Sequence, residues 1–295
     1  MTFFGPKRIG LVLGSGSARG FAHIGVLKVL EEEGLAPYAI AGTSMGALIG
    51  AFYAAGVPLA ELEEIALDFD VRQVTSVGDV ALGKGAVFSG EKVQAFLRQY
   101  LPATFEELAM PFGCVATDLT RNQPVRFTSG DLIAAVRASV SVPLAFLPVR
   151  MDDALLIDGY VTEPAPVRLA RHLGGETIVA VDVSGDGTVG MPEGDASPSA
   201  AVRIWELRDT IRSGSAYRRG SGSLDVLGAV SEAFEGRLAA EALREADIVI
   251  SPPVHHLTGM DFGQAAELIE AGEFATLVEL DAIRRKSRRP APSDA

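Results

Sequence analysis

Apolar residues along this chain gather in short runs, which alternate with amphipathic stretches and with glycine-rich turns. The run at 8–13 leads into glycine and is typical of a buried parallel strand, and the run at 37–44 has the same character. Segments with helical spacing of apolar residues follow these runs, at 21–35 and at 45–56. Strand, turn and helix thus occur twice near the start of the chain, which predicts an α/β fold with a parallel sheet.

The remainder of the chain continues this alternation. Further strands are predicted at 112–119, 123–130, 154–160, 177–184 and 247–254. Helices are predicted at 131–143 and at 166–174, and one or two more close the chain within 265–286. The pattern from 59 to 103 is mainly helical and amphipathic, with a glycine-rich break.

No linker or internal repeat divides the pattern, so we expect one domain over 1–284, followed by a disordered polar tail at 285–295. The segment 185–235 has a different composition. Its first part is rich in glycine and serine, and it encloses a helix-like piece at 200–219 that contains Trp205. Two interpretations are open: a surface excursion with one packed helix, or a mobile lid beside a site.

Composition narrows the possible partners. A chain of 295 residues with 48% hydrophobic residues has ample material for a core, and its net charge of −12 argues against nucleic acid. The same charge disfavours purely electrostatic docking on anionic lipid. Cys114 is the only cysteine and sits in an apolar run, so we expect a buried thiol and a reducing compartment. No leader peptide or membrane-spanning run is recognised, so the expected location is cytoplasmic.

A serine lies at the turn between the second predicted strand and its helix. The residues Gly42-Thr43-Ser44-Met45-Gly46 match G-x-S-x-G, a pattern that is weak by itself but strengthened by this placement. A serine at such a bend projects its hydroxyl outward, next to the free N–H groups of the helix that begins at Met45. The motif alone fits a nucleophile and a small-residue packing turn equally well.

The turn after the first strand supplies a candidate anion site. Small residues from Gly14 to Gly20 let successive backbone N–H groups line one concave surface. The ends of neighbouring parallel strands emerge at the same edge of a sheet, so this loop should face Ser44. A dinucleotide site would need an acidic residue at the end of the second strand, which is absent, and no G-K-[ST] of a P-loop occurs.

A nucleophilic serine also needs a base. Asp158 follows three apolar residues and precedes Gly159, which by itself fits an ordinary Asp-Gly turn. In apolar surroundings such a carboxylate can take the serine proton directly, because desolvation raises its pKa. A triad in the order Ser44, Asp158, then His255 or His256 is the alternative.

His23 lies in the first predicted helix, and we interpret it as a packed structural residue. No cluster of His, Cys and Asp has the spacing of metal ligands, so no metal or cofactor is expected.

Taken together, these motifs resemble the patatin-like phospholipase family, and in particular its small bacterial members. GSGSARGFAHIGVL resembles the glycine-rich oxyanion loop and first helix of that family, GTSMG resembles its nucleophile elbow, and IDGYVTEPAPV resembles its Asp-Gly segment. The end of the chain, DIVISPPV with DFGQAAELIEAG, is also similar, so the resemblance covers nearly the whole sequence. It implies a three-layer α/β/α fold with a mostly parallel central sheet.

The resemblance implies a Ser-Asp dyad in which Ser44 is the nucleophile and Asp158 its base. The implied oxyanion hole uses backbone N–H groups within Gly14, Ser15, Gly16, Ser17, Ala18, Arg19 and Gly20, with Arg19 supporting the loop. The implied supporting residues are Gly42, Met45, Gly46 and Gly159, with Met45 adding one N–H group. Three positions depart from the family pattern: Ser15 and Ser17 replace glycines, and Tyr160 stands where glycine or alanine often follows Asp-Gly.

The leading hypothesis is therefore a serine acyl hydrolase that cleaves carboxylic ester bonds of lipids, such as phospholipids or lysophospholipids. Contact with a membrane would be peripheral, through apolar side chains near the site, at the inner membrane surface. The alternative is a non-catalytic or regulatory protein that keeps the patatin-like fold and binds acyl ligands.

Overall fold

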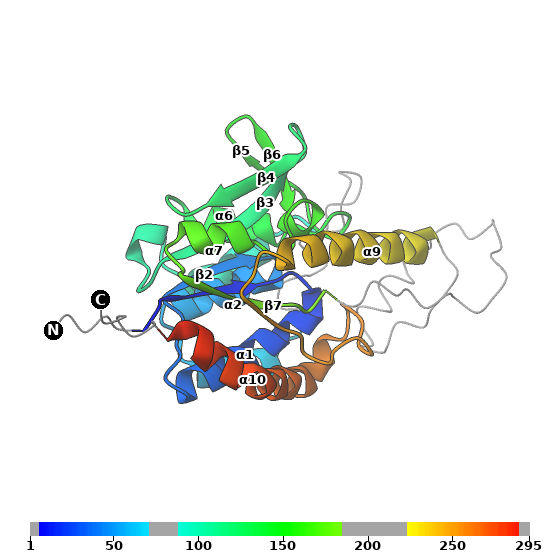
Figure 1. The fold of residues 1–295 in the computed structure, drawn as a ribbon. Coiled ribbons are helices and arrows are strands. Elements are labelled where there is room, and N and C mark those ends of the chain that lie inside the picture. Colours follow the sequence, from blue (N-terminus) through cyan, green and yellow to red (C-terminus); the bar gives the residue numbers. More distant parts are fainter. Residues whose placement is uncertain (1–5, 71–87, 185–222, 289–295) are drawn as a thin grey trace.

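A computed structural model describes residues 6–70, 88–184 and 223–288 of the chain, and for 223–227 the backbone only. Eight strands form a single mixed sheet in these ranges (Figure 1). In chain order they are β1 (Ile9–Leu13), β2 (Ala39–Thr43), β3 (Phe112–Asp118), β4 (Gln123–Phe127), β5 (Val149–Met151), β6 (Ala154–Asp158), β7 (Thr177–Val181) and β8 (Ile248–Ile250).

The strand order is β5-β6-β3-β2-β1-β7-β8, with β4 paired to β3. All neighbours from β3 across to β8 run parallel, whereas β4, β6 and β5 join by antiparallel pairing. The mostly parallel α/β sheet predicted from the sequence is therefore confirmed. The antiparallel strands gather at one end of the sheet, and β6 carries Asp158 there.

Side chains alternate between two buried faces of the central strands. Leu11, Leu13 and Ile40 belong to one core cluster, with helices α1 (Ala22–Glu32), α2 (Met45–Ala54) and α10 (Ala265–Ser287). Val12 and Ala41 belong to the other, with α7 (Val167–His172) and α9 (Ser223–Leu243). Figure 1 shows α1 and α10 on one side of the sheet and α7 and α9 on the other. Burial on both faces explains why these strands read as continuous apolar runs.

The remaining described elements complete the helical layers. They are the helices α3 (Leu59–Leu67), α5 (Glu91–Tyr100) and α6 (Leu132–Ser139) and the 3-10 turns η1 (Ser17–Phe21), η3 (Phe105–Glu107), η4 (Gly159–Val161) and η5 (Phe262–Gln264). Cys114 is buried in β3, as its apolar neighbours indicated. Among the helices of the described ranges, none has the length and apolar character required to cross a bilayer.

The structure differs from the sequence pattern in three places. Strand β5 was not predicted, and neither was α9, which begins inside the predicted lid segment and runs past it. The last helix is a single unit that continues to Ser287, so it includes the first residues assigned to the tail. The helix-like piece at 200–219 lies outside the described residues, as does most of the predicted lid.

Candidate active site

The turns after β1 and β2 meet at one edge of the sheet. In the parallel register Leu13 pairs with Gly42, so both strands end at the same level. Gly46 then approaches the first turn so closely that a Cβ on it would collide with the carbonyl oxygens of Leu13 and Gly14. Glycine is therefore required at this position, and the close approach of the two turns places Ser44 beside the glycine-rich loop.

Ser44 occupies a strained turn between β2 and α2. Its φ is 55° and its ψ is −122°, a left-handed φ that non-glycine residues seldom adopt. Its backbone N–H donates to the Oγ of Ser139, 3.1 Å away, at the end of α6. The residue is 7% exposed, so the hydroxyl sits in a nearly closed site.

Asp158 reaches the same place from the antiparallel part of the sheet. It ends β6, where it pairs with Ala116 of β3, and its N–H donates to the carbonyl of Ser141 at 3.0 Å. Gly159 follows in close contact with the backbone of Val115, because a Cβ there would strike the Val115 carbonyl oxygen. Ser44 Oγ donates to Asp158 Oδ2 across 2.7 Å.

The Asp158 carboxyl is fully buried, with Tyr160 N–H donating to its Oδ1 at 3.0 Å and the Ser44 hydroxyl donating to its Oδ2. Loss of hydration raises the pKa of Asp158 to about 8, and the nearby charge of Glu235 adds to this rise. The hydrogen bonds from Tyr160 and Ser44 oppose the rise but are smaller in effect. The carboxyl is thus suited to exchange a proton near neutral pH.

Backbone N–H groups of the two turns that meet beside Ser44 are candidate donors to a bound anion. In the loop, the N–H groups of Gly14 and Ser15 bond to the carbonyls of Val181 and Pro164, and those of Ala18 and Arg19 bond to Gly259 and Gly16. By contrast, the N–H groups of Gly16, Ser17 and Met45 have no acceptor among the described residues. Ser17 has a φ of 53°, which fits the glycine usual at its position in the family pattern.

The other predicted site residues support this arrangement. Gly20 lies in close contact with the side chain of Met45, and Gly42 with the backbone of Gly46. Arg19 is buried, and its guanidinium donates to the carbonyls of Ser184, at 3.1 Å, and Leu257. Arg19 thereby connects the loop to the segments that follow β7 and β8.

None of the four histidines, all within the described ranges, bonds to Ser44 or Asp158. His23 is fully buried and its Nε2 lies 2.8 Å from the Gly14 carbonyl oxygen. Burial lowers its pKa to about 4, so the ring is neutral and Nε2–H is the donor. His255 and His256 are exposed, and His256 Nε2 contacts Glu267 Oε1 at 2.6 Å. The geometry therefore does not assemble the triad alternative.

Several contacts to the site were not predicted from the sequence. Ser139 binds the Ser44 amide, Ser231 of α9 lies 2.7 Å from the hydroxyl of Tyr160, and the buried Glu235 accepts a hydrogen bond from Ser15 Oγ. These residues belong to no local motif, because their roles arise only when distant segments fold together. The departure at Tyr160 was visible in the sequence, although its partner was not.

The fold and the site define a class of proteins. These are α/β proteins in which a serine on a strand-to-helix turn donates a hydrogen bond to a buried carboxyl group. The family model for patatin-like phospholipase matches residues 11–171, more than half of the 295-residue chain. The chain belongs to this family. The matched region contains both Ser44 and Asp158 and ends before α9.

Related proteins agree with this assignment. An NTE family protein of Mycobacterium tuberculosis is 36% identical over 210 residues, covering 71% of this chain and 57% of the relative. Human patatin-like phospholipase domain-containing protein 6 is 29% identical over 281 residues, covering 90% of this chain and 20% of the relative. Lysophospholipase NTE1 of Pyricularia oryzae is 25% identical over 291 residues, covering 96% and 19%. The chain therefore spans little more than half of the mycobacterial relative and about a fifth of the other two.

Among solved structures, VipD from Legionella pneumophila superposes with a TM-score of 0.54 at 13% identity, covering 94% of this chain and 67% of VipD. This likeness concerns the fold alone. It agrees with the mixed, mostly parallel sheet with helices on both faces.

Proposed function

We propose that this protein is a serine acyl hydrolase that cleaves carboxylic ester bonds of lipids through Ser44 and Asp158. The observation that carries the proposal is the 2.7 Å hydrogen bond from Ser44 Oγ to the buried Asp158 Oδ2. A general base must lie within such reach of the proton it removes. The raised pKa of Asp158 supports the same role, because a carboxylate of ordinary pKa is a weak base at neutral pH.

In the first half of the reaction, Ser44 Oγ attacks the ester carbonyl carbon while Asp158 takes the serine proton. The tetrahedral intermediate then collapses, the bond to the alcohol oxygen breaks, and Asp158 delivers the proton to that oxygen. The alcohol leaves and the acyl group stays on Ser44. In the second half, Asp158 takes a proton from water, the resulting hydroxide attacks the acyl carbon, and Ser44 oxygen recovers the proton as the acid departs.

The N–H groups of Gly16, Ser17 and Met45, which have no acceptor in the part of the chain that the structure describes, are the proposed oxyanion donors. They belong to the two turns that meet beside Ser44, and α2 begins at Met45 with its N-terminal dipole directed there. Each such donor lowers the barrier by about 2.7–4 kcal/mol in comparable sites. That these donors have no other acceptor within 6–70, 88–184 and 223–288 supports the proposal, since an occupied donor could not bind the developing charge.

The proposed substrates are phospholipids and lysophospholipids. Membership of the patatin-like phospholipase family supports this class, as does the lysophospholipase named among the relatives. Apolar side chains near the site suit a lipid surface: Val230 and Phe234 on α9 and Met260 before η5 are all exposed. We accordingly propose peripheral contact with a membrane surface rather than insertion.

A lipid panel tests the proposed function. Wild type and Ser44→Ala protein would be incubated with lysophosphatidylcholine, diacyl phosphatidylcholine and a p-nitrophenyl ester, and released fatty acid or nitrophenol would be measured. The proposal expects release by the wild type and loss of at least about 1000-fold in Ser44→Ala. Tight fatty-acid binding without turnover of any ester would instead favour the regulatory, acyl-binding alternative.

A further inference from the structure

Helix α9 contributes two side chains to the site although it lies outside the region that matches the family model. Ser231 and Glu235 are one helical turn apart and therefore lie on the same face. Ser231 Oγ is 2.7 Å from Tyr160 Oη, and Glu235 Oε1 accepts a hydrogen bond from Ser15 Oγ. One contact touches the residue that donates to Asp158, and the other touches the oxyanion loop.

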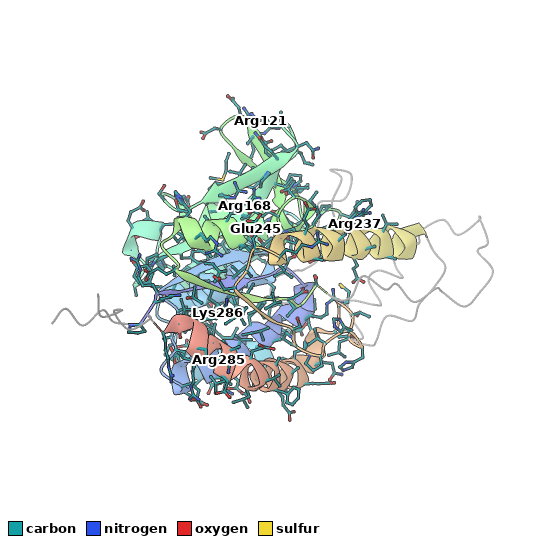
Figure 2. All side chains as sticks on the ribbon, viewed as in Figure 1. Arg121, Arg168, Arg237, Glu245, Arg285 and Lys286 are labelled. Atoms are coloured by element: carbon teal, nitrogen blue, oxygen red, sulfur yellow. The ribbon has the colours of Figure 1, made fainter. Side chains whose placement is uncertain are left out.

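The far end of α9 is firmly seated. Ala239 and Leu243 are buried in the core cluster shared with α7, and Arg168 of α7 donates from Nε to Glu245 Oε2 at 2.9 Å. Figure 2 shows Arg168 and Glu245 together where the end of α9 meets α7. The helix is thus fixed to the sheet layer, so its contacts to the site are held from a rigid support.

Glu235 is buried to an extent unusual for a carboxyl group. It is 8% exposed, and its hydrogen bond comes from Ser15, itself 2% exposed. The ionisable groups that face it include Arg19 from η1, Glu232 from α9, Asp182 after β7 and Asp158 at the end of β6. Burying a carboxyl group costs free energy that exposure to water would avoid. The buried position of Glu235 therefore indicates that its carboxyl has a function at the site.

Ser15 is the residue through which Glu235 reaches the loop. Its own N–H bonds to the Pro164 carbonyl at 2.9 Å, and its hydroxyl bonds to Glu235. The next two residues, Gly16 and Ser17, carry the N–H groups without an acceptor among the described residues. Holding the amide and the side chain of Ser15 in place restrains the backbone that leads into those two N–H groups.

We propose that Glu235 is a positioning residue that acts through Ser15 to hold the oxyanion loop in its reactive conformation. This inference rests on the proposed function, because it assigns the loop a part in ester hydrolysis. The acceptor oxygen of Glu235 is the feature that matters, and its negative charge is not required. Loss of the acceptor loosens donors that act in the transition state, so kcat falls while KM changes little.

The test compares variants at Glu235 with a matched control on the same helix. Glu235→Ala is expected to lower kcat on a p-nitrophenyl ester by about 10- to 100-fold, with KM within about threefold of wild type. Glu235→Gln keeps an acceptor oxygen and is expected to retain most of kcat. Glu241→Ala removes an exposed carboxyl from α9 and should leave kcat unchanged. If Glu235→Ala proves unfolded, Glu235→Met fills the same volume without the carboxyl and is measured in its place.

A double-mutant cycle with Ser15→Ala shows whether the two residues act as a unit. The double variant should have a kcat no lower than that of the less active single variant. Additive losses, a wild-type kcat in Glu235→Ala or an equal loss in Glu235→Gln would each overturn the inference.

A second readout does not depend on turnover. Amide hydrogen exchange over residues 14–18 should be faster in Glu235→Ala than in Glu235→Gln, and equal protection would contradict the inference. Failure of the proposed function would appear in a separate measurement, in which the Ser44→Ala variant hydrolyses the ester as fast as the wild type does.

Discussion

Ser44 and Asp158 are 114 residues apart in sequence, yet the Oγ of one donates to the Oδ2 of the other across 2.7 Å. Both side chains are buried, and each is held at its backbone by the same short segment at the end of α6. Ser139 accepts from the Ser44 amide through its hydroxyl, and Ser141 accepts from the Asp158 amide through its carbonyl. One turn of chain therefore sets the relative position of the two residues.

The raised pKa of Asp158 predicts the pH dependence of activity. Desolvation is the main cause, and the charge of Glu235 adds to it. Because the base must be ionised to accept the serine proton, kcat/KM should rise with pH and level off above an apparent pKa near 8. Steady-state rates on a neutral ester from about pH 5 to about pH 9.5 measure this rise of kcat/KM. A rise with its midpoint near the ordinary carboxyl pKa would mean that the Asp158 carboxyl is not desolvated in solution.

The same shift predicts an effect on stability. The folded protein keeps the Asp158 proton up to about pH 8, whereas the unfolded chain releases it near 3.8, so the wild type loses stability as pH rises between these values. Asp158→Asn carries no such penalty: its amide oxygen still accepts from Tyr160 N–H, and its amide nitrogen would donate to Ser44 Oγ, which reverses the direction of that hydrogen bond. Its melting temperature should exceed that of the wild type, by a margin that widens from about pH 5 to about pH 8. Calorimetry that finds the same margin at every pH would refute this.

Ser139 is expected to matter for both stability and turnover. Ser139→Ala leaves the buried Ser44 N–H without its acceptor, which should cost about 1–3 kcal/mol of unfolding free energy. It also releases the strained backbone of Ser44, so kcat should fall by about tenfold or more.

Ser141→Ala is the matched control for this variant. It removes a buried hydroxyl that contacts Arg137, but the carbonyl that binds Asp158 remains. Urea unfolding should show destabilisation of both variants, and kinetics should show a loss of kcat in Ser139→Ala alone. Equal losses of kcat would assign the effect to general loosening of the turn.

Contact with lipid surfaces is expected to depend on α9. Phe234 is 64% exposed on the helix that contacts the site, and Phe274 is 61% exposed on α10, on the opposite side of the sheet. In a flotation assay with phosphatidylcholine vesicles, Phe234→Ser should therefore lower the fraction of protein bound to the vesicles by about threefold or more. Phe274→Ser should leave that fraction unchanged. The reverse order would place the lipid-facing surface on α10.

The sequence was most informative where local chemistry is decisive. The turn at Ser44, the glycines around it and the Asp158–Gly159 step could be recognised because close backbone approach permits few residue types. Buried parallel strands were equally clear, since both of their faces are apolar. Each of these features is encoded in a short, continuous stretch of sequence.

Features that depend on distant contacts were not predictable. Glu235 accepts a hydrogen bond from Ser15, which lies 220 residues earlier in the chain. No pattern in the sequence of α9 indicates which carboxyl group of this helix is buried. Strand β5 spans only Val149–Met151, too short for its alternation to stand out. The pattern of α9 did not stand out either, because apolar residues occur on several of its faces, including the exposed Val230 and Phe234.

The most direct test of the central claim is the rate at which a fluorophosphonate labels the protein, with the modified residue located by mass spectrometry. The account predicts a single adduct on Ser44, at least about 100-fold slower labelling in Asp158→Asn, and a wild-type rate in His256→Ala. An adduct on another residue, or an unchanged rate in Asp158→Asn, would contradict it.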